Sequence, residues 1–300
     1  MGNSLFVYNL GMLFRCWASA FLLLCAVAVT APAEFAAQKA PAASGARILL
    51  LPRHIVSGEP ATLAVLDGNG RLTPGVTVNF SDGEHVVTNT TGRALFVAPP
   101  NAGVLYATIG PRSARVYTTI LTPTEVASPS IQVSQAPQFA SLADRFELAG
   151  KGLCADADAN TIHIGGRPAL ILASSRATLI VLPPAALQAG PATVEVACAN
   201  RLAPAFSIAF LDLTLNADGS PLAPGEHRTL TVDVRGSTAQ VPLEAVNLSP
   251  KIAQVLGGNP AKTSSTGGPR NTAHFELVGR ERGDFLISVR LLPTPTPLPH

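Results

Sequence analysis

The segment NTIHIGGRPALILASSRATLIVLPPAAL, residues 160–187, contains three short apolar runs separated by turn residues. Ile162–Ile164 alternates between apolar and polar side chains, which is the period of a strand buried on one face. Gly165-Gly166 supplies the positive-φ positions of a tight hairpin turn, and Ala169–Leu172 follows as the return strand. A Pro-Pro pair ends the next run, Leu179–Leu182, because proline lacks the N–H that a sheet needs. The segment therefore predicts antiparallel strands joined by turns.

The same alternation of apolar runs and turn residues extends over the chain from Arg47 onward. The clearest further runs are Ile48–Leu51, Ala61–Leu66, Val76–Phe80, Ala94–Val97, Val104–Ile109, Arg228–Val234, Pro242–Asn247, Ala273–Val278 and Phe285–Val289. Turn residues recur between them at the spacing expected of a β-sandwich, and no long amphipathic helix interrupts the series. The sequence thus predicts an all-β chain of tandem Ig-like β-sandwich domains behind an N-terminal signal peptide.

Two parts of the chain resemble known families. The segment at 160–187, with ELAGKGLC at 147–154 before it and GPATVEVACANRLAPAFSIAF at 190–210 after it, resembles an IPT/TIG domain over about 130–211. The stretches ATLAVLDGNGRLTPGVTVNFSDG and TNTTGRALFVAPPNAGVLYATIG resemble the bacterial Ig-like modules of invasin-type adhesins over about 47–121. The second resemblance implies a seven-strand sandwich without catalytic machinery.

These patterns divide the chain into successive segments. They are a signal peptide at 1–33, a linker at 34–46, a bacterial Ig-like domain at 47–121, a Pro/Ser/Thr linker at 122–130, an IPT/TIG-like domain at 130–211, a third Ig-like β domain at 212–292 and a Pro/Thr tail at 293–300. The third domain matches no family that we recognise. The Pro-bearing linker is expected to form no helix, and the tail is expected to stay extended. We therefore expect a semi-rigid string of domains.

The beginning of the chain has the pattern of a secretory leader. The apolar run Leu22–Val29 follows the single cation Arg15 and leads to Ala31-Pro32-Ala33, a small-x-small site for cleavage before Glu34. This pattern predicts a secreted, periplasmic or cell-surface protein with no membrane insertion after cleavage.

Two further possibilities concern the leader. Met12 is an alternative start, because the residues before it carry no charge and add little to targeting. Lipid attachment at Cys25 is not expected, because Leu24 stands where lipid-attachment sites have a small residue.

Composition restricts the class of partner. Hydrophobic residues make up 47% of the chain and charged residues 13%, so the chain can form buried cores. Removal of a leader that contains Arg15 and no acidic residue lowers the formal net charge from +2 to +1. Nucleic acid and anionic membranes require a basic surface, so the composition favours a protein or polysaccharide partner.

Cys154 and Cys198 are the cysteines that remain after leader cleavage. In an oxidising compartment such a pair is first interpreted as a disulfide, here closing a loop worth about 4 kcal/mol on the chain-entropy model. The alternative is two buried thiols that behave as small apolar residues. A metal site is less favoured, because two sulfurs without nearby histidines do not complete a tetrahedral shell.

The sequence offers little for catalysis. The histidines beyond the leader are His54, His85, His163, His227, His274 and His300, and none stands in an H-E-x-x-H motif. No serine lies in a G-x-S-x-G turn. His163 and His274 alternate with apolar neighbours, which places each on the less buried face of a strand. We predict that the protein is not an enzyme and needs no cofactor.

One short acidic run invites a metal interpretation. Asp156, Asp158 and Asn160 resemble the start of a calcium loop, but Thr161 and Arg167 stand where that loop needs glycine and a bidentate glutamate. The run is therefore interpreted as a polar connection between strands, and no metal site is predicted.

Aromatic residues that could stack on sugars are scarce. Trp17 lies in the leader, which leaves Tyr106 and Tyr117 as the tyrosines beyond it. The sequence favours an exported, non-catalytic Ig-like protein with an adhesin-like binding or spacer role at the cell surface or in the envelope. The alternative is an accessory carbohydrate-binding protein of an exported enzyme system.

Overall fold

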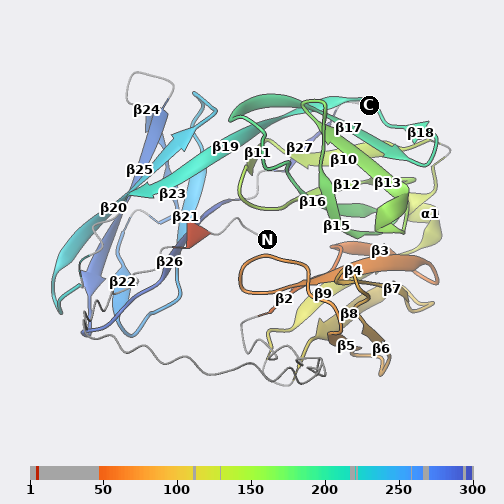
Figure 1. Cartoon of the computed structure of the whole chain (residues 1–300), viewed down its shortest axis with the longest axis horizontal. Coiled ribbons are helices and arrows are strands. Elements are labelled where there is room, and N and C mark those ends of the chain that lie inside the picture. The colour runs from red at the N-terminus through yellow and green to blue at the C-terminus, as the bar shows by residue number, and fades with distance from the viewer. Residues whose placement is uncertain are drawn as a thin grey trace, which may run out of the picture.

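The structure is a computed structural model that describes residues 5–6, 47–110, 113–128, 130–216, 220, 222–257, 259–265, 270–292 and 295–298. Cleavage before Glu34, the alternative start at Met12, Cys25, most of the predicted leader and the linker at 34–46 lie outside these residues. Strands dominate the described part, where the helical segments are α1 (Pro123–Val126) and the 3-10 turn η1 (Ala157–Ala159). The prediction of an all-β fold of Ig-like sandwiches is confirmed (Figure 1).

The first sandwich consists of two sheets. Their strands are β2 (Ile48–Leu50), β4 (Pro60–Leu66) and β7 (Arg93–Val97) in one, and β3 (His54–Val56), β9 (Val116–Leu121), β8 (Gly103–Thr108), β5 (Thr77–Phe80) and β6 (His85–Val87), in that order, in the other. The described part of this sandwich has eight strands, one more than the resemblance implied. The extra strand arises because the first strand is interrupted around Pro52: β2, before it, pairs antiparallel with β4, and β3, after it, pairs parallel with β9.

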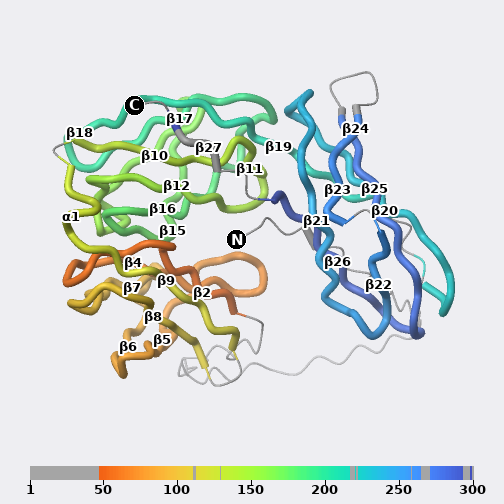
Figure 2. Tube along the Cα trace, turned by 180° about the vertical axis from the view of Figure 1, so that it is seen from behind, coloured from red at the N-terminus to blue at the C-terminus, as the bar shows by residue number. Residues whose placement is uncertain are grey.

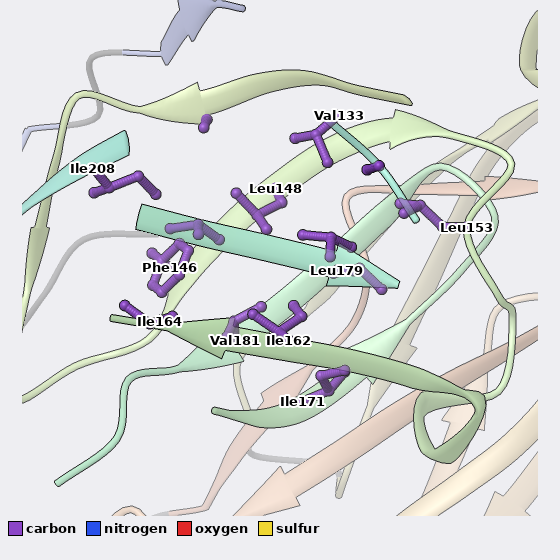
Figure 3. Packing of buried hydrophobic residues seen from close by; sticks show 14 of the residues in the cluster. Val133, Phe146, Leu148, Leu153, Ile162, Ile164, Ile171, Leu179, Val181 and Ile208 are labelled. Carbon is purple, nitrogen blue, oxygen red and sulfur yellow. The ribbon is translucent and has the colours of Figure 1, made fainter. Parts of the chain in front are cut away.

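The second sandwich also has two sheets. One contains β10 (Gln132–Pro137), β12 (Phe146–Lys151), β16 (Thr178–Leu182) and β15 (Leu170–Ser174), and the other contains β14 (Arg167–Pro168), β13 (Asn160–Ile164), β17 (Gly190–Cys198) and β19 (Phe206–Asn216), with β11 (Phe139–Ser141) and β18 (Arg201–Leu202) attached. Gly165 and Gly166 have φ of 56° and 74° in the β13–β14 turn, as the sequence predicted. The predicted return strand Ala169–Leu172 is wrong, because the short β14 pairs with β13 and the chain then crosses to the other sheet, where β15 pairs with β16. Apolar side chains from both sheets meet between the layers (Figure 3).

The third sandwich begins within β19. Its other strands are β20 (His227–Arg235), β25 (Arg270–Gly279), β22 (Ala253–Val255) and β24 (Ser264–Ser265) on one side, and β21 (Pro242–Asn247), β23 (Ala261–Lys262), β26 (Ile287–Leu291) and β1 (Leu5–Phe6) on the other. Phe275, Leu230 and Val289 are fully or almost fully buried in its core. β1 belongs to the predicted leader and pairs with β26, at the edge of this sheet.

The sandwiches are joined through their sheets. Thr62 of β4 pairs with Ser174 of β15, so one sheet runs from the first sandwich into the second. β19 pairs with β17 through its first half and with β20 through its second half, so it belongs to the second and the third sandwich. The predicted boundary at 211/212 falls inside this strand. Figures 1 and 2 show the first sandwich beneath the second and the third beside it.

The expectation that the 122–130 linker forms no helix is wrong. Pro123 begins α1, a position where its missing N–H costs nothing. The Glu125 carboxylate accepts hydrogen bonds from the backbone N–H and the hydroxyl of Thr122, both at 2.7 Å. Val126 is buried in a small cluster with Val56 of the first sandwich and Ala177 of the second. The linker is therefore packed against both sandwiches.

The C-terminal tail, predicted to be extended, contains the strand β27 (Pro295–Pro297). It pairs antiparallel with β10 of the second sandwich. The backbone N–H of Leu298 donates to the carbonyl of Ser134 at 3.1 Å. The chain thus returns from the third sandwich to the second. No helix in the described residues has the length and hydrophobicity to span a membrane.

Candidate functional site

Cys154 and Cys198 form a disulfide in the structure, with their Cα atoms 5.5 Å apart. The buried side chain of Asn160 holds the backbone beside it. Its Oδ1 accepts from the N–H of Cys154 at 3.0 Å, and its Nδ2 donates to the carbonyls of Cys154 and Asp156, both at 2.8 Å. Asn160 is therefore engaged in holding the loop between β12 and β13.

The other members of the acidic run have separate partners. Asp158 forms an ion pair at 2.6 Å with Arg93 of the first sandwich. Asp156 accepts from the N–H of Asp158 at the start of η1. No group of three or more His, Cys, Asp and Glu side chains gathers to hold a metal within the residues that the structure describes. The run works as a structural connection between two sandwiches.

The histidines inside the described ranges occupy separate strands. Nδ1 of His227 lies 2.8 Å from the carboxylate of Glu276, and Nδ1 of His274 lies 3.1 Å from the Thr231 hydroxyl. Both contacts are on the exposed face of the third sandwich. Burial, with a smaller effect of Arg53, lowers the pKa of His54. The other two are His85 on β6 and His163 on β13. His300 lies outside the described residues.

The first and second sandwiches meet at a seam with an apolar centre and polar borders. Its apolar centre consists of Leu50, Ala64 and Leu66 from the first sandwich and Leu172, Ala173 and Ile180 from the second. At its borders, the Ser175 hydroxyl donates to the carbonyl of His54 at 2.5 Å, and Arg176 pairs with Glu59 at 2.9 Å. The Thr62 hydroxyl donates to the carbonyl of Ala155 at 3.0 Å. This seam positions the two sandwiches.

Glu147 provides a pH-dependent prediction. Glu147 lies on β12 between the core residues Phe146 and Leu148, and its side chain is on the opposite face of the strand. Across the sheet it stands opposite Ile180 of the seam. Burial raises the pKa of Glu147, and the nearby charge of Arg53 opposes this effect. A raised folded-state pKa means that ionisation costs the folded protein stability as the pH rises.

We therefore expect Glu147→Gln to raise the melting temperature at pH 7.5 and to leave it unchanged near pH 3, which is below the ordinary pKa of glutamate of about 4.3, so that the carboxyl is protonated in both states. Thermal unfolding at the two pH values measures this. Glu195→Gln, at an exposed position of β17, is the control. An equal gain at both pH values would contradict the explanation.

Tyr106 and Tyr117 face each other across β8 and β9 on the outer face of the five-stranded sheet. Their ring centres are 6.3 Å apart and their planes are tilted by 54°. Tyr106 is 41% exposed and Tyr117 is 63% exposed. The guanidinium of Arg115 lies 5.5 Å from the centre of the Tyr106 ring. The sequence indicated that aromatic residues are scarce but did not predict that these two lie together.

Polar side chains continue this face. Asn79 on β5 pairs with Thr108 on one side and with His85 on the other. Ser81 follows and accepts from the N–H of Tyr106 at 3.2 Å. We call Tyr106, Tyr117, Arg115, Asn79 and Thr108 the tyrosine face.

A groove of about 910 Å³ lies where the second and third sandwiches meet. Leu187 and Pro191 line it from the second sandwich, and Asp212, Arg235 and Thr238 line it from the opposite side. Among the residues that the structure describes, no histidine, cysteine or lysine lines this groove. The tyrosine face exposes two neighbouring aromatic rings and is the stronger candidate for a binding surface.

Comparisons with known proteins give weak structural similarities only. No family model matches the sequence, and no curated protein matches it. The glucan-utilization protein SGBP-B of Bacteroides ovatus, solved with a mixed-linkage heptasaccharide, is 12% identical with a TM-score of 0.31 and covers 80% of this chain and 73% of its own.

Two other solved structures are similar to a lower degree. Domains 1–6 of the surface-layer protein SbsC are 12% identical with a TM-score of 0.21, covering 84% of this chain and 39% of that one. Immunoglobulin domains 1–5 of Sidekick-1 are 12% identical with a TM-score of 0.24, covering 78% of this chain and 60% of that one. Similarities of this size do not bear on what the chain binds. The chain is an all-β protein of Ig-like sandwiches.

Proposed function

We propose that this chain is an exported, non-catalytic protein that acts at the cell surface or in the envelope as a rigid binding or spacer unit. The continuity of its sheets carries the proposal. A chain of flexibly linked domains needs no shared strands, whereas here β4 pairs with β15 and β19 serves two sandwiches. Such continuity suits a protein that presents a surface in a fixed orientation.

The chemistry of the described side chains supports a non-catalytic role. The histidines occupy separate strands, and the two cysteines are linked to each other. The acidic residues of the 156–160 run serve an ion pair and a helix cap. We therefore infer a role that depends on surfaces and not on a reactive site.

The seam provides the test. Leu172→Glu places a charge in its apolar centre, where ionisation carries a large desolvation cost. We expect small-angle X-ray scattering to show a larger radius of gyration for this variant, and sedimentation with the envelope fraction of the source cells to weaken. Leu170→Glu, on the same strand but 43% exposed, should match the unaltered protein in both measurements.

The two readouts separate the two parts of the proposal. An unchanged radius of gyration for Leu172→Glu would contradict the role of the seam. Absence of the unaltered protein from the envelope fraction would contradict the binding role.

A role as an accessory carbohydrate-binding protein is the second candidate. The pairing of Tyr106 with Tyr117 favours it, because exposed aromatic rings are the side chains that stack on sugars. Capture of the protein by a glycan array, without dependence on the seam, would favour this candidate.

A further inference from the structure

The tyrosine face has the layout of a platform for an extended ligand. Tyr106 and Tyr117 are neighbours on adjacent antiparallel strands, and their positions are fixed by the backbone pairing of β8 with β9. Thr119 and Val104, the next outward pair along these strands, continue the platform away from Arg115. A surface built on strands loses little conformational entropy when a ligand binds.

Hydrogen-bonding groups lie next to the rings. Asn79 is exposed and pairs with Thr108 across β5 and β8. The described structure gives the Asn79 amide no hydrogen-bond partner, so it remains available to a ligand. An amide and a hydroxyl beside aromatic rings can bind the hydroxyl groups of a sugar while its C–H groups stack on the rings.

The charge of the face decides the class of sugar. The strands β3, β9, β8, β5 and β6 contain no aspartate or glutamate. Arg115 is exposed and directly precedes β9, over the Tyr106 ring. The nearest acidic residues along the chain, Asp82 and Glu84, lie in the β5–β6 turn at the end of the sheet, where the Asp82 carboxylate accepts from the N–H of Glu84 at 3.1 Å. A cation on an acid-free sheet complements a carboxylate.

We propose that the tyrosine face binds an acidic polysaccharide whose sugar units carry carboxylates. The pyranose rings stack on Tyr106 and Tyr117, a carboxylate pairs with Arg115, and hydroxyl groups bind Asn79 and Thr108. This inference names a partner class for the proposed surface-binding protein and rests on that proposal.

Affinity electrophoresis of the purified protein in gels containing polygalacturonate tests the proposal. We expect the protein to be retarded, and Tyr117→Ala to weaken the affinity by about tenfold or more, because exposed aromatic side chains that a ligand covers contribute most of the binding energy of such surfaces. Arg115→Gln should weaken it to a similar extent. Tyr117→Phe, which keeps the ring, should retain the affinity and shows that the loss comes from the ring.

Matched variants on other surfaces serve as controls. Leu202→Ala, at a position 71% exposed on the second sandwich, and Arg282→Gln, exposed on the third, should leave the affinity unchanged. Circular dichroism melting of each variant identifies any loss of folding.

Three outcomes would overturn the proposal. They are absence of retardation by polygalacturonate, equal affinity for the neutral polysaccharide dextran, and equal affinity for poly-glutamate, which would indicate a protein partner. If retardation is absent while the protein still sediments with the envelope fraction, the ligand class fails and the surface-binding role stands.

Discussion

Replacing Cys154 and Cys198 together by alanine is expected to lower the free energy of unfolding of the second sandwich by about 4 kcal/mol. The disulfide closes a loop with a sequence separation of 44, and opening that loop returns chain entropy to the unfolded state. The double variant avoids leaving one free thiol in a buried position. Chemical denaturation at equilibrium measures the change.

Reduction of the unaltered protein provides the matched comparison. Dithiothreitol should produce a similar loss, and it should have no further effect on the double variant. A difference of less than about 1 kcal/mol between oxidised and reduced protein would show that the cross-link adds little to stability. The loop between β12 and β13 would then be held by its hydrogen bonds alone.

Replacing Asn160 by alanine is expected to lower the free energy of unfolding by about 3 kcal/mol. The change removes the partners of the Cys154 N–H and of the carbonyls of Cys154 and Asp156, and unpaired buried groups cost about 1–3 kcal/mol each. The Ser174 hydroxyl still donates to the Cys154 carbonyl, which limits the loss. Thermal or chemical unfolding measures the effect.

Asn200→Ala, at an exposed position of the same sandwich, is the control and should change stability by less than about 0.5 kcal/mol. Added calcium should leave the melting temperature unchanged, both for the unaltered protein and for Asn160→Ala. A calcium-dependent rise in melting temperature that disappears in Asn160→Ala would contradict the structural role of the 156–160 run.

The strands that alternate strongly could be predicted from the sequence. Arg228–Val234 lies within β20 and Pro242–Asn247 coincides with β21, because period two is the signature of a strand with one buried face. The short strands β3 and β6 were not predicted. Each has three residues, too few to show a period, and each is defined by its neighbours in the sheet.

The strands that form the seam are nearly continuous apolar runs in the sequence and do not alternate. In β4 every residue after Pro60 is buried, because one face points into the first sandwich and the other contacts the second. Leu179–Leu182 within β16 is also an unbroken apolar run, with side chains in both the core and the seam. Continuous apolar strands indicate burial on both faces. This pattern predicts that something covers the outer face, but not what covers it.

The sequence shows which tyrosines the tyrosine face can contain, but it does not predict that they lie together. Tyr106 and Tyr117 are separated in the chain by a connection that reverses its direction, and a shift of one residue in strand pairing would have placed one ring in the core. The sequence names the two aromatic residues, but the pairing of β8 with β9 places them together. Arg115 joins them because it directly precedes β9.

The tail strand β27 has a consequence for self-association. Leu298 donates its N–H to β10, and Thr296 stands opposite Ala136, so the alternating positions 295 and 297 turn their backbone nitrogens away from the sheet. Both are prolines and have no hydrogen to donate. A strand of a neighbouring molecule that approached this border would meet no donor at either position. The chain thus closes the border of its second sandwich with a segment that resists fibril growth.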